Sequence, residues 1–362
     1  MRLGRIATVL AVVAAITASA CGGSSSSGSG GSSGGGAKKI ALLLPESKTA
    51  RYESKDRPLF EAKVKSLCSD CQVLYSNANQ DAAAQQSQAD AALTNGANVL
   101  VLDAVDGKAA AAIAQKAKQQ KVPVVSYDRL IQNTTGVDVY ISFDNHKVGQ
   151  LQGQALLQGL AGKPDPTIVM INGSPTDANA AQFKAGAHSV LDGKAKIAKE
   201  YDTPDWSPDQ AQNEAQQALT ALGNKVDAIY AANDGTAGGA IAAMKAAGIK
   251  APFPPVTGQD AELAGIQRVV VGEQYMTVYK AIKPEAEGAA ELAVSLAQGK
   301  GLPSGMAKSK QNNGTTDVPS ELLTPVAVTK KNINDTVVKD GFWPKDQICT
   351  AQYADACKAA GL

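Results

Sequence analysis

The stretch VPVVSYDRLI, residues 122–131, begins as an apolar strand and ends on an acid and a base, Asp128 and Arg129. Taken alone, this charged pair indicates no more than an exposed strand end. The pattern recurs along the chain, because short apolar runs alternate with longer, alanine-rich amphipathic segments. The other runs are IALLL, VLVL, VYISF, TIVMI, AIYAA, PVTG and YMTVY. Continuous apolar strands that alternate with helices predict an α/β fold with parallel sheets covered on both faces.

Polar residues follow almost every apolar run. In an open parallel sheet the carboxyl ends of the strands meet at one edge, so these residues are expected to line a single crevice. They are Glu46, Asp103, Asp128, Arg129, Asp144, Asn145, Asn172, Asp177, Asn233, Asp234, Gln259, Asp260 and Lys280.

The lining mixes acids, amides and bases in nearly equal charge. Such a set suits a neutral polyol, because each sugar hydroxyl both donates and accepts hydrogen bonds and charged partners make the stronger ones. Two of the scarce aromatic residues, Tyr52 and Trp206, can cover the apolar face of a sugar ring. The chain lacks the glycine fingerprint of dinucleotide sites and the P-loop lysine motif. We interpret GTAGGA, residues 235–240, as a closely packed helix start.

Length and composition indicate a globular protein large enough for two domains. The chain has 362 residues, of which 44% are hydrophobic and 19% charged. Lys and Arg total 35 against 34 for Asp and Glu, without a basic stripe. This balance argues against a nucleic-acid surface.

The N-terminus predicts export. Residues 1–20 have the charged start and short apolar run of a signal peptide, and the run ends in TASAC. Small residues before Cys21 are similar to the lipobox of bacterial lipoproteins, in which the cysteine is lipidated; the alternative is ordinary signal cleavage beside an incidental cysteine. Residues 21–37 then form a lipidated cysteine and Ser/Gly tether, whose fifteen Ser/Gly residues reach roughly 20 Å. The expected location is the outer face of the cell membrane.

Four further cysteines occur as two closely spaced pairs, Cys68 with Cys71 and Cys349 with Cys357. Outside the cytoplasm these spacings favour two local disulfides over the other connectivities. A zinc site of four thiolates is the alternative, but the spacing of the second pair is unusual for one.

From about Lys38 to Phe342 the chain resembles the type I periplasmic sugar-binding proteins of ABC importers, in particular the D-xylose-binding proteins. The resemblance rests on SYDR, YISFDN, GSP, NDGTAGGAI, GQDAELAGI, TVYK and DVPS. It implies two Rossmann-like lobes joined by a three-strand hinge. The lobes would comprise residues 38–144 with 281–311 and residues 145–280 with 312–342, and residues 343–362 would form a structural tail.

The resemblance also implies which residues contact the sugar. Asp144, Asn145 and Asn313 are expected near the site with weaker claims to contact. No cofactor or metal is implied. The contact residues are Arg51, Tyr52, Asp128, Arg129, Asp177, Asn179, Trp206, Asn233, Asp260 and Lys280.

Three other functions are alternatives to sugar capture for transport. A glycosidase needs a protonated carboxyl, whereas Arg129 and Lys280 are expected to hold nearby carboxylates ionised, and His146 and His188 lack a nucleophile elbow. A sugar-responsive repressor would need a helix-turn-helix ahead of Lys38, where a signal and tether stand. A membrane-tethered sugar sensor remains an alternative use of the same site.

The sequence therefore predicts a non-enzymatic, monomeric lipoprotein whose function is to capture a monosaccharide. D-xylose is favoured over glucose, arabinose, galactose or ribose. Binding would shift the hinge towards closure, and the closed form would dock on an ABC permease driven by its ATPase.

Overall fold

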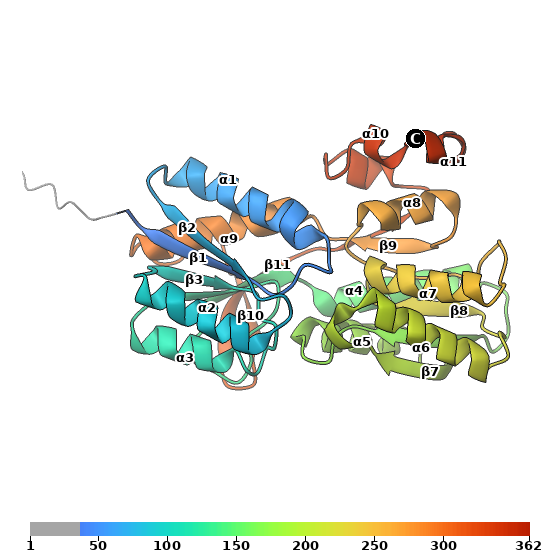
Figure 1. Ribbon diagram of the computed structural model, residues 1–362, viewed down its shortest axis with the longest axis horizontal. Helices are drawn as coiled ribbons and strands as arrows, with labels where there is room; N and C mark the ends of the chain where they lie inside the picture. Colours follow the sequence, from blue (N-terminus) through green and yellow to red (C-terminus); the bar gives the residue numbers. More distant parts are fainter. Residues whose placement is uncertain (1–36) are drawn as a thin grey trace, which may run out of the picture. The chain divides into compact units, whose positions relative to one another are not determined.

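The computed structural model describes residues 37–362 (Figure 1). The predicted signal peptide, the Cys21 lipidation site and the tether up to residue 36 lie outside the described residues. Within residues 37–362, no helix combines the length and apolar character needed to cross a membrane.

The first lobe is built on a seven-stranded sheet in the order β10-β11-β5-β4-β3-β1-β2, parallel except for the edge strand β10. Alternate residues of β1 face opposite sides: Ile40 and Leu42 pack with Phe60 of α1, whereas Ala41 and Leu43 pack against α2 and α3. Helices α1 and α9 therefore cover one face, and α2 and α3 the other. The strands are β1 (Lys39–Leu44), β2 (Gln72–Asn77), β3 (Val99–Leu102), β4 (Val124–Tyr127), β5 (Val139–Phe143), β10 (Ser309–Asn312) and β11 (Asp317–Leu323). The helices are α1 (Arg57–Leu67), α2 (Ala82–Thr94), α3 (Ala111–Gln119) and α9 (Ile282–Ala297).

The second lobe repeats this arrangement with shorter sheets. Three parallel strands lie in the order β7-β6-β8, and β9 pairs antiparallel with β12. Helices α4 and α5 cover one face, while α6 and α7 cover the other. The strands are β6 (Thr167–Asn172), β7 (Lys196–Asp202), β8 (Ala228–Ala231), β9 (Met276–Tyr279) and β12 (Val326–Thr329). The helices are α4 (Asn145–Gly159), α5 (Ala178–Leu191), α6 (Pro208–Ala221), α7 (Asp234–Ala246) and α8 (Leu263–Val271).

Glycines allow two helix pairs of this lobe to touch. A Cβ on Gly149 of α4 would lie 1.9 Å from the Phe183 carbonyl oxygen of α5, and one on Gly239 of α7 would lie 2.2 Å from the Pro208 carbonyl oxygen of α6. GTAGGA thus opens a closely packed helix, as the sequence predicted.

The chain crosses between the lobes after β5, after β9 and after β11. The assignment of residues 312–342 to the second lobe is wrong for β11, because Ser320 pairs with Tyr140 and Leu323 with Phe143 in the first sheet. This register buries Val318 in the first lobe, and only β12 belongs to the second.

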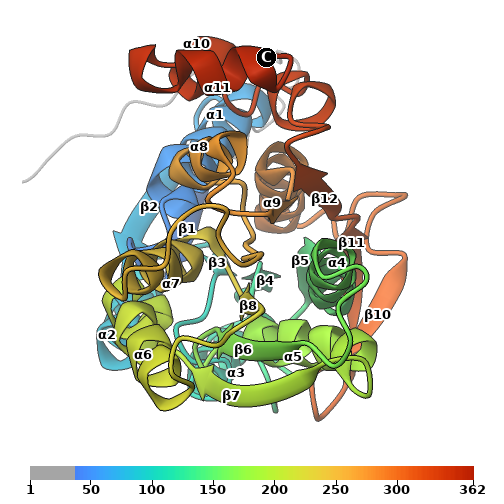
Figure 2. The ribbon, with the colours of Figure 1, turned by 90° about the vertical axis from the view of Figure 1, so that its right-hand side faces the viewer.

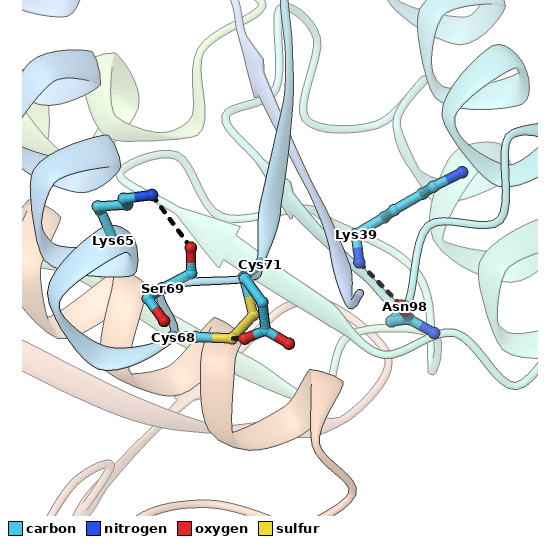
Figure 3. The surroundings of a disulfide bond; sticks show 7 residues. Lys39, Lys65, Cys68, Ser69, Cys71 and Asn98 are labelled. Atoms are coloured by element: carbon cyan, nitrogen blue, oxygen red, sulfur yellow. Dashed lines mark hydrogen bonds between the residues drawn. A yellow bond between two sulfur atoms is a disulfide. The ribbon is translucent and has the colours of Figure 1, made fainter. Parts of the chain in front are cut away.

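The tail folds over α8 (Figure 1). From here on the tail denotes residues 334–362, which begin earlier than the predicted 343–362. It contains η3 (Asn334–Val338), α10 (Lys345–Ile348), η4 (Ala351–Tyr353) and α11 (Ala354–Ala359). The disulfide Cys349–Cys357 closes it, and Ile348 and Cys357 are buried with α8. Figure 3 shows the second disulfide, Cys68–Cys71, in the turn between α1 and β2. Both predicted pairings are confirmed.

Candidate functional site

A cavity lies where the carboxyl ends of the strands of the two lobes meet. Its atom-free volume, counted up to its open mouth, is about 260 Å³. All ten residues that the resemblance implied line it, together with Thr49, Phe183 and Gln259. Figure 2 looks along the molecule from the side of the second lobe, with β6, β7 and β8 in front of the strands of the first lobe.

Arg51 enters the cavity from the first lobe, just before the π-helical turn η1 (Tyr52–Asp56). Its Nε and Nη2 donate to the two Asp56 carboxylate oxygens at 3.0 and 2.6 Å, and Nη2 also donates to Glu285 Oε2 of α9 at 2.8 Å. Nη1 lies 3.3 Å from Asp128 Oδ2 and 3.8 Å from Asp260 Oδ1. The partners on one edge fix the guanidinium so that the other edge faces the cavity.

Arg129 follows β4 and is equally buried. It donates through Nη1 to the Ala104 carbonyl oxygen and through Nη2 to the Tyr52 hydroxyl, both at 3.2 Å. Its Nε lies 3.0 Å from Asp177 Oδ2 of the second lobe, but the angle is unsuitable for a hydrogen bond. Among the described residues, this Nε has no hydrogen-bond partner. Arg129 therefore keeps donor capacity for a ligand.

Lys280 and the two aspartates beside it complete the charged lining. Lys280 Nζ lies 3.1 Å from Asp260 Oδ1 and 3.8 Å from Asp128 Oδ1. Asp260 Oδ1 and Gln259 Oε1 are buried and accept no hydrogen bond from any described residue. These acceptors and the Arg129 donor give the cavity the mixed capacity that a hydroxyl group can use.

Neighbouring charged groups determine the protonation states of Asp128 and Lys280. Burial alone would raise the pKa of Asp128, but Arg51, Lys280 and Arg129 outweigh it and lower that pKa to about 2. Burial would likewise lower the pKa of Lys280, yet Asp128 and Asp260 raise it. Asp128 and Lys280 are therefore both charged at neutral pH.

Asp177 departs from the expectation that the cations hold every nearby carboxylate ionised. Burial raises its pKa in spite of Arg129. Asp103, buried behind the Arg129 Nε at 3.5 Å, also has its pKa raised by burial. The carboxylates around Arg129 are thus less firmly ionised than Asp128.

Side chains at helix starts are fixed by capping. The Asp177 side chain accepts a hydrogen bond from the backbone N–H of Asn179 at the start of α5. Asn233 forms a reciprocal capping box with Thr236 at the start of α7. Asn179 in turn donates to the Asp128 carbonyl oxygen at 3.0 Å, which joins the two lobes.

Two aromatic side chains are also held by polar contacts. Tyr52 donates through its hydroxyl to Asp128 Oδ2 at 3.2 Å, and Trp206 Nε1 donates to Asp177 Oδ2 at 3.0 Å. The indole lies directly over Gly173, where a Cβ would come within 2.0 Å of the ring. Both rings therefore have one defined orientation in the lining.

Three lining residues have a strained backbone. Asp128, Trp206 and Asp260 have φ of 54°, 53° and 87°, a region that residues other than glycine seldom adopt. Such conformations persist where the surroundings over-determine them, and they cluster at functional sites.

The three residues that were expected near the site, Asp144, Asn145 and Asn313, lie outside the cavity lining. Asp144 caps α4, Asn145 donates to the Tyr140 and Ser142 hydroxyls, and Asn313 donates to the carbonyl oxygens of Ile131 and Thr134. They serve the structure near the crossings.

Known proteins share this sequence and architecture. A family model described as a periplasmic binding protein domain matches residues 40–301. The D-xylose-binding periplasmic protein of Escherichia coli (strain K12) is 41% identical over 315 residues, which cover 86% of this chain and 92% of that protein. The multiple sugar-binding periplasmic receptor of Rhizobium radiobacter is 36% identical over 283 residues, covering 73% of this chain and 80% of that protein.

Solved structures agree. An ABC transporter solute binding protein from Clostridium phytofermentans with bound β-D-glucose has a TM-score of 0.79 and 29% identity, covering 86% of this chain and 100% of that chain. The chain therefore belongs to the periplasmic binding proteins, a family of solute-binding proteins rather than enzymes.

Proposed function

We propose that this protein captures one monosaccharide between its lobes and delivers it to an ABC importer, with D-xylose as the favoured sugar. The observation that carries the proposal is the cavity itself, in which buried donors and acceptors of Arg129, Asp260 and Gln259 retain hydrogen-bonding capacity. A sugar ring with hydroxyls around its edge can use these groups while Tyr52, Phe183 or Trp206 covers its apolar face.

The lobes supply different parts of the site. Arg51, Asp128 and Arg129 come from the first lobe, and Asp177, Asn233 and Asp260 from the second. A sugar that touches both sets makes its full complement of contacts only when the lobes are closed. Binding then shifts the hinge equilibrium towards closure, and the closed surface is what a permease would recognise.

D-xylose is favoured by the relative from Escherichia coli, which is named for that sugar and aligns over most of this chain. Other similar proteins are named for multiple sugars or hold glucose. A handful of charge-assisted hydrogen bonds and ring contacts, after ordering costs, is consistent with a micromolar dissociation constant, about −8 kcal/mol.

Calorimetric titration of the full chain with D-xylose, D-glucose, L-arabinose, D-ribose and D-galactose tests the proposal. We expect D-xylose to bind most tightly. Tighter binding of another of these sugars would change the specificity but keep the function. No heat with any of the five, together with hydrolysis of a glycoside, would favour an enzyme instead.

The export part of the proposal is that Cys21 is lipidated and holds the protein at the outer membrane face. Expression with and without Cys21→Ser in a lipoprotein-processing bacterium, followed by detergent phase partitioning, tests it. We expect the protein that retains Cys21 in the detergent phase and the Cys21→Ser variant in the aqueous phase. Aqueous partitioning of both would refute the anchor without affecting the sugar site.

A further inference from the structure

Residues of the tail contact two cavity-lining segments from outside. Trp343 Nε1 donates to the Ala261 carbonyl oxygen at 2.8 Å. Ala261 directly follows Asp260, and both residues have positive φ, 50° and 87°. The hydrogen bond therefore fixes a strained loop whose aspartate faces the cavity.

The same part of the tail holds a lysine of the first lobe. Lys55 Nζ donates to the Phe342 carbonyl oxygen at 2.6 Å and lies 3.9 Å from the centre of the Trp343 ring and 5.0 Å from that of Phe342. Lys55 belongs to η1, the turn that begins with Tyr52 and directly follows Arg51. The contact thus reaches the segment that carries two further lining residues.

A third contact lies beside Lys280. Phe342 is buried and packs on Tyr279, with ring centres 5.1 Å apart. The tail is itself anchored to the second lobe, because Gln267 of α8 donates to the Gln347 carbonyl oxygen and Cys349–Cys357 closes the segment. Phe342 and Trp343 therefore move with the second lobe, whereas Lys55 moves with the first.

The interaction is more than a surface ion contact. Burial lowers the pKa of Lys55, so placing the cation there has a desolvation cost. Two aromatic faces and a carbonyl oxygen offset this cost, and cation–π contacts gain strength when they are shielded from water.

We propose that Lys55 and Trp343 are positioning residues for ligand binding: the tail ties the Arg51-bearing turn of the first lobe to the Asp260 loop of the second and thereby slows ligand release. The inference rests on the proposed function, since it concerns how long the closed lobes retain the ligand. It assigns to the tail a role beyond the structural cap that the sequence predicted.

The test measures D-xylose dissociation by stopped-flow fluorescence in the full chain. Lys55→Ala and Trp343→Ala should each speed release about tenfold with little change in the association rate, and the double variant should be no faster than either one. Lys55→Arg keeps a cation over the rings and should restore slow release. Lys65→Ala is the matched control, because Lys65 of α1 donates to the Ser69 carbonyl oxygen of its own lobe (Figure 3). Release from Lys55→Ala at the unmodified rate, or equally fast release from Lys55→Arg and Lys55→Ala, overturns the inference.

A second arm needs no sugar. Hydrogen exchange of the Asp260, Ala261 and Glu262 amides should be several-fold faster in Trp343→Phe, which keeps the ring but loses the donor to Ala261. Lys65→Ala should leave these rates unchanged. If the unmodified protein binds no sugar, the proposed function fails, and this arm still decides the inference: unchanged exchange in Trp343→Phe contradicts it.

Discussion

Arg51 and Arg129 are both almost fully buried beside the cavity, yet the protein holds them differently. Arg51 makes three hydrogen bonds of 2.6–3.0 Å to Asp56 and Glu285, both in its own lobe. Arg129 makes no hydrogen bond to a carboxylate among the described residues, and its nearest carboxylate, Asp177, belongs to the other lobe.

The two arginines therefore have different roles. The own-lobe partners of Arg51 fix it before any ligand arrives, so this arginine is part of the fold as well as of the lining. In its own lobe Arg129 donates only to a carbonyl oxygen and a hydroxyl among the described residues, those of Ala104 and Tyr52, and its remaining donor is available to a ligand. Loss of Arg51 should therefore show mainly in stability, and loss of Arg129 mainly in binding.

The largest expected effect is on folding. Arg51→Ala leaves the buried carboxylate of Asp56 without the cation that makes two hydrogen bonds to it, which should lower the free energy of unfolding by about 3–5 kcal/mol in urea titrations without sugar. Arg57→Ala is the control, since Arg57 also faces two carboxylates, Glu53 and Glu61, but is 38% exposed. It should cost less than about 1 kcal/mol. Equal losses in the two variants would remove the distinction between the arginines.

Arg129→Ala should abolish the thermal stabilisation that sugar confers and weaken binding by at least about 100-fold, because charged hydrogen bonds to the ligand are lost. The sugar-free fold should persist, since burial already raises the pKa of Asp103 and Asp177 and either group can become neutral. Differential scanning calorimetry with and without D-xylose measures both quantities. Unchanged stabilisation by sugar would show that the site is misplaced.

Acid should distinguish Asp128 from its neighbours. Its pKa falls from 3.8 to about 2 on folding, so its ion pairs add stability above about pH 4 that disappears as the pH drops towards 2. The stability difference between the unmodified protein and Asp128→Asn should therefore shrink by about 2 kcal/mol between pH 6 and pH 2. Urea unfolding of both proteins across this range gives the difference, and a constant difference would contradict the assignment.

The smallest effect concerns Trp206, which holds the carboxylate opposite Arg129. Trp206→Phe keeps an aromatic face but loses the donor to Asp177, and should weaken sugar binding by roughly 3–10-fold. Trp206→Ala removes the face as well and should weaken it further. Calorimetry on both variants separates the two contributions. Equal losses would mean that the aromatic face contributes nothing, and no loss in Trp206→Phe would mean that the hydrogen bond contributes nothing.

The sequence predicted the lining where a simple pattern exists. Asp128 and Asn233 each stand directly after an apolar run, and parallel strands bring such positions to one edge. Phe183 had no such signal, because an apolar residue inside a helix is ordinarily core. Asp56 and Glu285 sit in helical segments, where acids are usually solvated, and only the fold shows that they converge on Arg51.

The fold was predicted as a class, but not in every connection. The run DVPSELL is compatible with either sheet, and its register with β5 depends on long-range pairing that no local pattern encodes. The tail was expected to be a cap, and its contacts with Lys55 and Ala261 join residues 287 and 82 positions apart in the chain. Such contacts follow from packing alone.

The most direct test of the central claim is calorimetric titration of D-xylose into the unmodified protein and into Arg129→Ala. The account predicts one-to-one binding with a micromolar dissociation constant for the first and no measurable heat for the second. Equal binding by both proteins, or binding by neither, would contradict it.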